Sequence, residues 1–347
     1  MKILKYMLVF IPISFIAAFM NASGTIMFIL ACLSIIPLAG LIGESTEEIS
    51  FYTGPKVGGF LNGTFGNATE LIISFFALKQ GLFDVVKSSI AGAVIGNILL
   101  VIGFSMLAGG LKYKTQKFNQ KVTEVSSSML LFAVLGLCIP AIFTHTVNPD
   151  LLNTRYEGLS LFVAVVMFII YILSLVFSFS THKYLYVSNE EEEGHAKWSL
   201  KKAIIILVLS TVIIAIESEF LVNGIEPITD ALGWSEFFVG IILIPIVGNA
   251  AEHSTAVVMA RKDKMDVALE IAIGSSLQII LFVAPILIFL SLLFTPMSIV
   301  FNPFELVALI ASVLIANRVS QDGESNWLEG IQLIAVYAII GACFFIL

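Results

Sequence analysis

Two stretches of small residues, each ending in a glutamate, carry side chains that could bind a metal cation. They are Gly66-Asn67-Ala68-Thr69-Glu70 and Gly248-Asn249-Ala250-Ala251-Glu252. Each lies within a long apolar segment, where an ionisable side chain costs about 2.5–3.5 kcal/mol by insertion scales. Two carboxylates in such matching contexts are expected to be functional.

The neighbours of the glutamates indicate which cation would bind. Asn67 and Asn249 come three residues before the glutamates, so on a helix each shares a face with its carboxylate. Gly63 and Pro245 are expected to loosen the helix and free backbone carbonyls. His253 directly follows the second glutamate and is expected to point elsewhere. Carboxylate, amide and carbonyl oxygens suit Ca²⁺ better than Zn²⁺.

The same carboxyl groups can also exchange protons. Desolvation favours the neutral, protonated form of a carboxyl group, whereas a cation bound beside it favours the charged form. Cation and protons therefore compete for the oxygens of Glu70 and Glu252, and the two glutamates can release Ca²⁺ by taking up protons.

The two motifs belong to an internal repeat. Glu70 and Glu252 are 182 residues apart, and the same offset aligns Asp84 with Asp266 and Gly92 with Gly274. A run of matches at one offset is the sign of a repeat architecture.

Each repeat carries a second polar motif, Gly92-Ala93-Val94-Ile95-Gly96-Asn97 and Gly274-Ser275-Ser276-Leu277-Gln278. Gly92 and Gly96 form a GxxxG pattern that predicts close helix packing. Asn97 and Gln278 are interpreted as oxygen donors or as hydrogen-bond partners that orient the glutamates, and contacts between helices alone would also explain them. Ser275-Ser276 are expected to bond to the backbone.

Further carboxylates lie near the ends of predicted spans. Glu47 and Glu219 occupy corresponding helices, where they could line the two mouths of a pathway and gate it, or be interfacial charges. Glu44, Glu48 and Glu217 are interpreted as interface residues.

The composition predicts an all-α polytopic membrane protein. The 347-residue chain is 58% hydrophobic and 12% charged, half the roughly 25% charged share of soluble domains. About 20 apolar residues span a bilayer. Eleven transmembrane helices are predicted, at residues 3–20, 25–42, 64–78, 90–107, 126–143, 159–179, 203–222, 237–259, 267–293, 299–316 and 327–347.

Charge distribution supports this count and sets an orientation. With the N-terminus in the cytoplasm, 15 of the 18 Lys and Arg residues fall inside, as the positive-inside rule requires. Repeats of five helices then insert in opposite directions, which is a transporter architecture with its site near the midplane. The expected organisation is an N-terminal peripheral helix, a first repeat, an acidic cytoplasmic linker and a second, inverted repeat, at 1–22, 23–180, 181–199 and 200–347.

The linker carries four consecutive glutamates at 190–193. Its charge fits a solvated connection that stays out of the bilayer. A divalent-cation sensor or a patch that attracts cations is the alternative.

The motifs resemble the Ca²⁺/H⁺ antiporter (cation/proton exchanger) family of the cation/Ca²⁺ exchanger superfamily over nearly the whole chain. The resemblance implies Ca²⁺ export against inward proton flow, with Glu70 and Glu252 binding cation and protons alternately. Asn67, Asn97, Asn249 and Gln278 are the matching polar positions, and the second and seventh helices would be sliding gates.

One position departs from the family pattern. Ala93 stands where the family usually has Ser, which puts in doubt a side-chain ligand there and the ion preference. The chain also lacks the long N-terminal extension of many plant members, so a bacterial plasma membrane is the expected location.

Other function classes fit less well. A Na⁺- or K⁺-coupled exchanger, or one that moves Mn²⁺, is the main alternative. A cation channel would need a continuous pore, often with symmetric rings of ligands. No enzyme motif, cofactor or nucleic-acid partner is indicated; the bilayer and the ions are the expected partners, and self-association into a homo-oligomer is left open.

Overall fold

The architecture is an all-helical bundle, as predicted. A computed structural model describes residues 2–146, 152–182 and 196–346. In this described part, two short strands, β1 (Thr115–Lys117) and β2 (Glu324–Asn326), pair antiparallel. The helices of the first part of the chain are α1 (Lys2–Met7), α2 (Phe10–Phe19), α3 (Gly24–Thr53), α4 (Pro55–Phe65), α5 (Ala68–Lys79), α6 (Phe83–Ile95), π-helical η1 (Gly96–Val101), α7 (Ile102–Tyr113), α8 (Gln120–Thr146), α9 (Leu152–Val176) and π-helical η3 (Phe177–Thr181).

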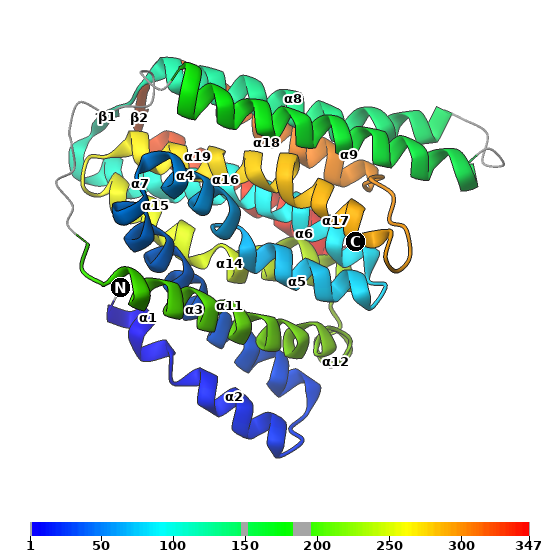
Figure 1. Ribbon diagram of the computed structural model, residues 1–347. Helices are drawn as coiled ribbons and strands as arrows, with labels where there is room; N and C mark the ends of the chain where they lie inside the picture. Colours follow the sequence, from blue (N-terminus) through cyan, green and yellow to red (C-terminus); the bar gives the residue numbers. More distant parts are fainter. Residues whose placement is uncertain (1, 147–151, 183–195, 347) are drawn as a thin grey trace.

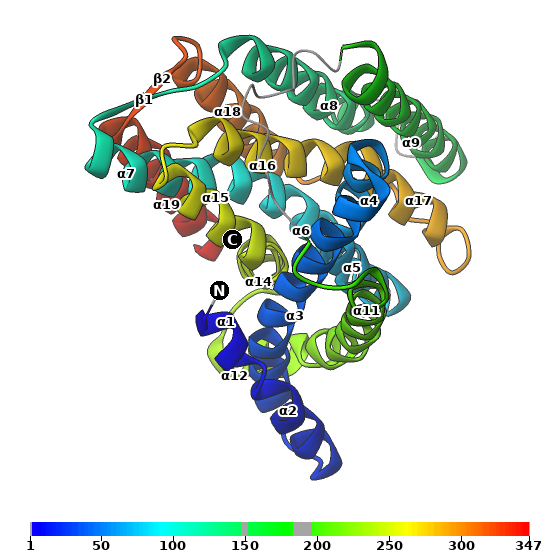
Figure 2. The same ribbon diagram turned by 60° about the vertical axis from the view of Figure 1, so that its left-hand side comes forward.

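The second part of the chain repeats this mixture of long and broken helices. Its elements are α11 (Leu200–Asn223), α12 (Ile225–Leu232), α13 (Glu236–Phe238), π-helical η4 (Val239–Leu243), α14 (Ile244–Gly248), α15 (Ala250–Ala260), α16 (Met265–Gln278), π-helical η5 (Ile279–Val283), α17 (Ala284–Ser291), α18 (Pro303–Val319) and α19 (Trp327–Ile346). Figures 1 and 2 show α8 and α9 together at one edge of the bundle and α1 and α2 at the opposite edge, beside α3.

The predicted number of spans is not confirmed. In the described residues, seven helices are long and apolar enough to cross a membrane, or eight if the pair Ile225–Leu232 and Glu236–Gly248, bent by 116°, is one span. Several predicted spans are interrupted. The third is divided between α4 and α5, and the eighth is divided between α14 and α15. These interruptions fall inside the two glycine-asparagine motifs.

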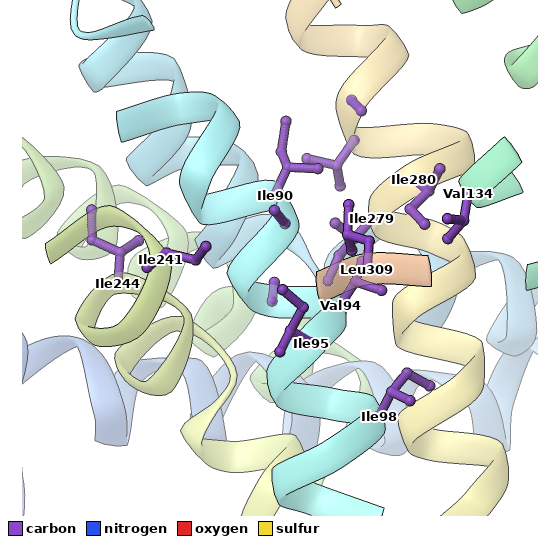
Figure 3. Packing of buried hydrophobic residues seen from close by; sticks show 14 of the residues in the cluster. Ile90, Val94, Ile95, Ile98, Val134, Ile241, Ile244, Ile279, Ile280 and Leu309 are labelled. Atoms are coloured by element: carbon purple, nitrogen blue, oxygen red, sulfur yellow. The ribbon is translucent and has the colours of Figure 1, made fainter. Parts of the chain in front are cut away.

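Two long helical segments, each interrupted by a π-helical turn, form the centre of the bundle. An 18-residue window of Phe83–Tyr113 (α6, η1 and α7) is 83% buried, and one of Met265–Ser291 (α16, η5 and α17) is 61% buried, against 17% for α19. Isoleucines and valines of α6 and η1 pack there against η5 and against η4 and α14 (Figure 3). The helices that carry the second polar motif of each repeat are therefore held in a close-packed core.

The outer helices present apolar side chains outward. Ile139 of α8 is 66% exposed, Phe162 of α9 is 65% exposed and Ile339 of α19 is 64% exposed. Exposed apolar surface on this scale marks contact with a membrane, and helices satisfy their backbone groups internally, as a bilayer requires. The chain is a multi-pass membrane protein.

The helices α3 and α11 form an antiparallel pair. At one end, Thr25 Oγ1 donates to the carbonyl of Pro227 at 3.1 Å. At the other end, Glu48 Oε2 accepts hydrogen bonds from the backbone N–H groups of Lys197 at 2.8 Å and Trp198 at 2.9 Å. Glu48 is buried, so its interpretation as an interface residue was wrong: the carboxylate anchors the chain before α11 to α3.

The GxxxG prediction holds for one of its two glycines. A Cβ atom added at Gly92 would lie 1.9 Å from the carbonyl oxygen of Ile241, so only glycine lets α6 approach η4. A Cβ atom added at Gly240 of η4 would likewise lie 2.0 Å from Ser88 Oγ of α6. Around Gly96 no heavy atom lies within 4 Å of an added Cβ, so this glycine makes no such contact.

Replacing Gly92 with alanine is expected to destabilise the protein by about 1–3 kcal/mol, the usual cost of overpacking, because the clash is with backbone. The measurement is the melting temperature in detergent micelles. Gly96→Ala is the matched control, since it adds the same methyl group into free space. Equal melting temperatures for the two variants would contradict the packing.

Candidate functional site

Two helix breaks position the glutamates. Asn67 precedes α5 with φ −101° and ψ 18°, and Asn249 precedes α15 with φ −93° and ψ 8°. Each asparagine leaves the helical path, and a new helix starts at the next residue. Glu70 and Glu252 are thus the third residues of their helices, where the free N–H groups and the dipole favour a negative charge.

Each glutamate lies against the glycine of the other motif. A Cβ atom added at Gly248 would be 2.7 Å from Glu70 Oε1, and one added at Gly66 would be 3.2 Å from Glu252 Oε1. The two motifs therefore meet across the centre of the protein. This contact explains the glycine in each motif, because the glycine of one half makes room for the carboxyl group of the other.

Several oxygens around the breaks lack a hydrogen-bond partner. Glu70 is 6% exposed, and neither of its carboxyl oxygens has a partner; the same holds for Glu252 Oε2 and Asn249 Oδ1. No ion pair involving either glutamate occurs in the described part of the chain. Uncompensated carboxylate and amide oxygens are the donor set of a hard cation such as Ca²⁺.

The other predicted polar residues form one hydrogen-bonded chain. Asn67 Nδ2 donates to Gln278 Oε1 at 2.5 Å, and the Ser275 hydroxyl donates to Asn67 Oδ1 at 3.0 Å. Asn97 Nδ2 donates to Ser275 Oγ at 3.1 Å, while Asn97 Oδ1 lies 3.1 Å from His253 Nε2. This chain joins α5 and η1 of the first half to α15 and α16 of the second. Asn67 thus bonds directly to Gln278, and Asn97 is connected to Asn67 through Ser275.

Two sequence interpretations are corrected by this chain. Ser275 was expected to bond to the backbone and His253 to point elsewhere, yet both belong to it. Only Ser276 bonds to its own helix, at 2.8 Å from the carbonyl of Ala272. The partners of Ser275 and His253 are more than 150 residues away in sequence, so no local pattern could have predicted these contacts.

The two halves of the site are not equivalent. At the offset of the repeat, Ser275 and Gln278 correspond to Ala93 and Gly96, which cannot form side-chain hydrogen bonds. Asn249 therefore lacks the partners that hold Asn67. Its Nδ2 donates instead to the carbonyl of Pro245 at 3.1 Å, and its Oδ1 stays unpaired.

Gly63 and Pro245 both lie within helices. Gly63 lies within the helix α4, and the carbonyl of Pro245 is occupied by the backbone and side-chain N–H groups of Asn249. Gly63 instead makes room for the hydroxyl of Tyr171, 3.1 Å from an added Cβ. Sequence reasoning missed Tyr171, because it lies in an otherwise apolar run of α9.

The mouth candidates lie outside this buried set. Glu47 of α3 and Glu219 of α11 are both exposed. Glu217, interpreted as an interface residue, is 0% exposed, and that interpretation was wrong. Among the described residues, no group of three or more His, Cys, Asp and Glu side chains could hold a metal, so the two glutamates and their amide neighbours are the ligand candidates.

The helix of Glu252 is anchored at its far end by the first half of the chain. The carbonyl of Arg261 accepts from Lys112 Nζ at 2.9 Å, and the carbonyl of Ala260 accepts from Gln116 Nε2 at 2.9 Å. Gln116 Nε2 also donates to Asp263 at 2.8 Å. Because these bonds satisfy the last carbonyls of α15, they fix the helix that carries the second glutamate.

Comparison with known proteins identifies similar chains. The family model described as sodium/calcium exchanger protein matches residues 23–180 and 202–346. A Ca(2+)/H(+) antiporter of Aphanothece halophytica is 48% identical over 98% of this chain and 95% of its own length. Ca(2+)/H(+) antiporter ChaA of Bacillus subtilis is 45% identical over 97% of both chains. The structure of native YfkE has a TM-score of 0.87 and 41% identity, covering 99% of this chain and 100% of that one.

Replacing Ser275 with alanine is expected to lower stability by about 1–3 kcal/mol, because the buried amides of Asn67 and Asn97 each lose a partner. Ser276→Ala is the matched control, since its hydroxyl bonds only within its own helix. Thermal unfolding of both variants in detergent measures the difference. A Ser276→Ala variant as unstable as Ser275→Ala would show that the cross-half chain contributes nothing.

Proposed function

This chain belongs to the sodium/calcium exchanger protein family, and on that basis we propose that it is a secondary active transporter that exchanges Ca²⁺ for H⁺. One observation carries the proposal: Glu70 and Glu252 lie at facing helix breaks, each against the other's glycine, and neither has a basic partner among the described residues. The names of the relatives from Aphanothece halophytica and Bacillus subtilis support the choice of the two ions.

The exchange follows from the charge of the pair. Two carboxylates carry two negative charges, which either one Ca²⁺ or two protons neutralise. An uncompensated charge in the low-dielectric interior is strongly unfavourable. The empty, doubly charged pair is therefore the least favourable state for a change of conformation, and this couples the movement of one ion to that of the other.

We assign different tasks to the polar neighbours. Asn249 offers an unpaired oxygen beside Glu252, so it is the amide that binds the cation directly. Asn67, Asn97 and Gln278 already bond within the chain of polar side chains that includes Ser275 and His253, so they position the two glutamate helices. Ala93 adds no hydroxyl ligand, and the resulting set of carboxylate and amide oxygens suits a hard divalent cation such as Ca²⁺.

Access to the pair is proposed to alternate by movement of α3 and α11. These helices form one antiparallel pair, and α3 is bonded at its two ends to the segments that flank α11, at Pro227 of α12 and at Lys197 before α11, which would allow the pair to slide as a unit. Glu47 and Glu219 are exposed on this pair, and we assign them to the two mouths. The transport involves no covalent chemistry and no cofactor.

The arrangement in the membrane is also a proposal. It comprises the peripheral segment 1–22, two inverted repeats at 23–180 and 200–347, and a cytoplasmic linker at 181–199, whose residues 183–195 lie outside the described part. The two segments matched by the family model, 23–180 and 202–346, support the repeats. The excess of Lys and Arg on one side supports a cytoplasmic N-terminus, and the bacterial relatives support a plasma membrane.

In inverted membrane vesicles, Ca²⁺ uptake is expected to require an acid interior and to need neither Na⁺ nor K⁺. Glu70→Gln and Glu252→Gln should each reduce uptake to the level of vesicles without the protein, because one remaining carboxylate cannot balance Ca²⁺. Glu226→Gln, at an exposed position on α12, is the control and should transport normally. If uptake depends on a Na⁺ or K⁺ gradient and not on pH, the coupling ion is Na⁺ or K⁺ and not the proton. Uptake that survives both mutations would refute the mechanism.

Asn249→Ala is expected to raise the KM for Ca²⁺ about tenfold, equivalent to about 1.4 kcal/mol of lost binding, with little change in melting temperature. The reason is that the Asn249 oxygen has no partner within the protein. Asn67→Ala should instead lower the melting temperature, because it strands Gln278 and Ser275. The opposite pattern, with Asn249→Ala unstable and its KM unchanged, would reverse the two roles.

A further inference from the structure

A third buried carboxyl group lies apart from the two glycine-asparagine motifs. Glu217 of α11 is 0% exposed, and its Oε1 accepts a hydrogen bond from the hydroxyl of Ser14, which is also 0% exposed. Ser14 belongs to α2, the helix at the edge of the bundle (Figures 1 and 2). The carboxyl group is thus held between the peripheral helix and the α3–α11 pair.

Two buried oxygens at this place have no hydrogen-bond partner. They are Glu217 Oε2 and the hydroxyl oxygen of Ser34 on α3, which is 0% exposed. The Ser34 hydroxyl lies close enough to the Glu217 carboxyl group to interact with it. The two atoms can pair in two ways: the Ser34 hydroxyl donates to a charged carboxylate, or a protonated Glu217 Oε2 donates to Ser34 Oγ. Leaving a buried polar group unpaired costs about 1–3 kcal/mol.

Within the described ranges, no opposite charge compensates Glu217. The helix α2 has no charged residue. The charged residues of α11 and of the other helices packed against it are Lys201, Lys202 and Glu219 of α11, Glu44, Glu47 and Glu48 of α3, Glu70 and Lys79 of α5, and Glu226 and Asp230 of α12. None of these forms an ion pair or a hydrogen bond with Glu217 in the described part of the chain.

We propose that Glu217 is a second proton-binding site, separate from the Glu70–Glu252 pair, whose proton joins α11 to α3 while Ser14 joins α11 to α2. The neutral form can bond to both serine hydroxyls without placing a charge in the apolar interior. Loss of the proton leaves an isolated charge among three helices, which is strongly unfavourable. The three helices are therefore bound to one another most tightly when Glu217 is protonated.

Infrared difference spectroscopy of the full-length protein in lipid vesicles tests this proposal. The background is the Glu70→Gln/Glu252→Gln variant, which removes the carboxyl groups of the transport site and makes the result independent of exchange activity. At neutral pH this background should show the carbonyl stretch of a protonated carboxyl group. Adding Glu217→Gln should remove that contribution, and Ca²⁺ should not alter it. The glutamine amide can still donate to Ser34, so the fold is retained.

Two further variants make the test specific. Ser34→Ala should shift the Glu217 band, because the proton loses its acceptor; this variant carries the test if Glu217→Gln does not fold. Glu226→Gln, which removes an exposed carboxyl group, should leave the band unchanged. Identical spectra with and without Glu217→Gln at every pH would overturn the proposal. A Glu217 carboxylate signal that changes on addition of Na⁺ or K⁺ would also overturn it, because the site would then hold a monovalent cation.

Discussion

The structure depends on the approach of two carboxyl groups inside an apolar bundle. Each glutamate can reach the centre only because the opposite motif has a glycine there: a side chain at Gly248 would be 2.7 Å from Glu70 Oε1, and one at Gly66 would be 3.2 Å from Glu252 Oε1. The breaks at Asn67 and Asn249 place both glutamates in the first turn of a helix, where the helix dipole offsets part of the cost of burying negative charge.

Around this centre, the two halves of the chain have diverged in a way that has physical consequences. The first asparagine is held by Gln278 and Ser275, whereas the second has only its own helix to bond to. The side chains of the two asparagines are therefore held differently, although the motifs around them match. One half forms a polar network, which is strong only when every member is paired, and the other half leaves the Asn249 side-chain oxygen without a partner among the described residues.

The elements outside the centre connect the site to the rest of the bundle. The hydrogen bonds from Lys112 and Gln116 hold the end of the helix that carries Glu252. Glu48 and Thr25 bind α3 to the segments just before and just after α11. The helices α6 and η4 are in backbone contact at Gly92. Close-packed interfaces of this kind transmit displacement, since they have few alternative arrangements.

The sequence by itself determined the class of fold and the identity of the central residues. Apolar runs identify membrane helices because a bilayer leaves backbone groups no other partner, and the matching glutamates stand out because buried charge is costly. Tertiary structure alone decided that each glutamate packs on the other's glycine, that Ser275 and His253 join the network, and that Glu217 and Glu48 are buried. Those contacts connect residues more than 140 positions apart, and local periodicity contains no information about which distant helix a polar side chain will face.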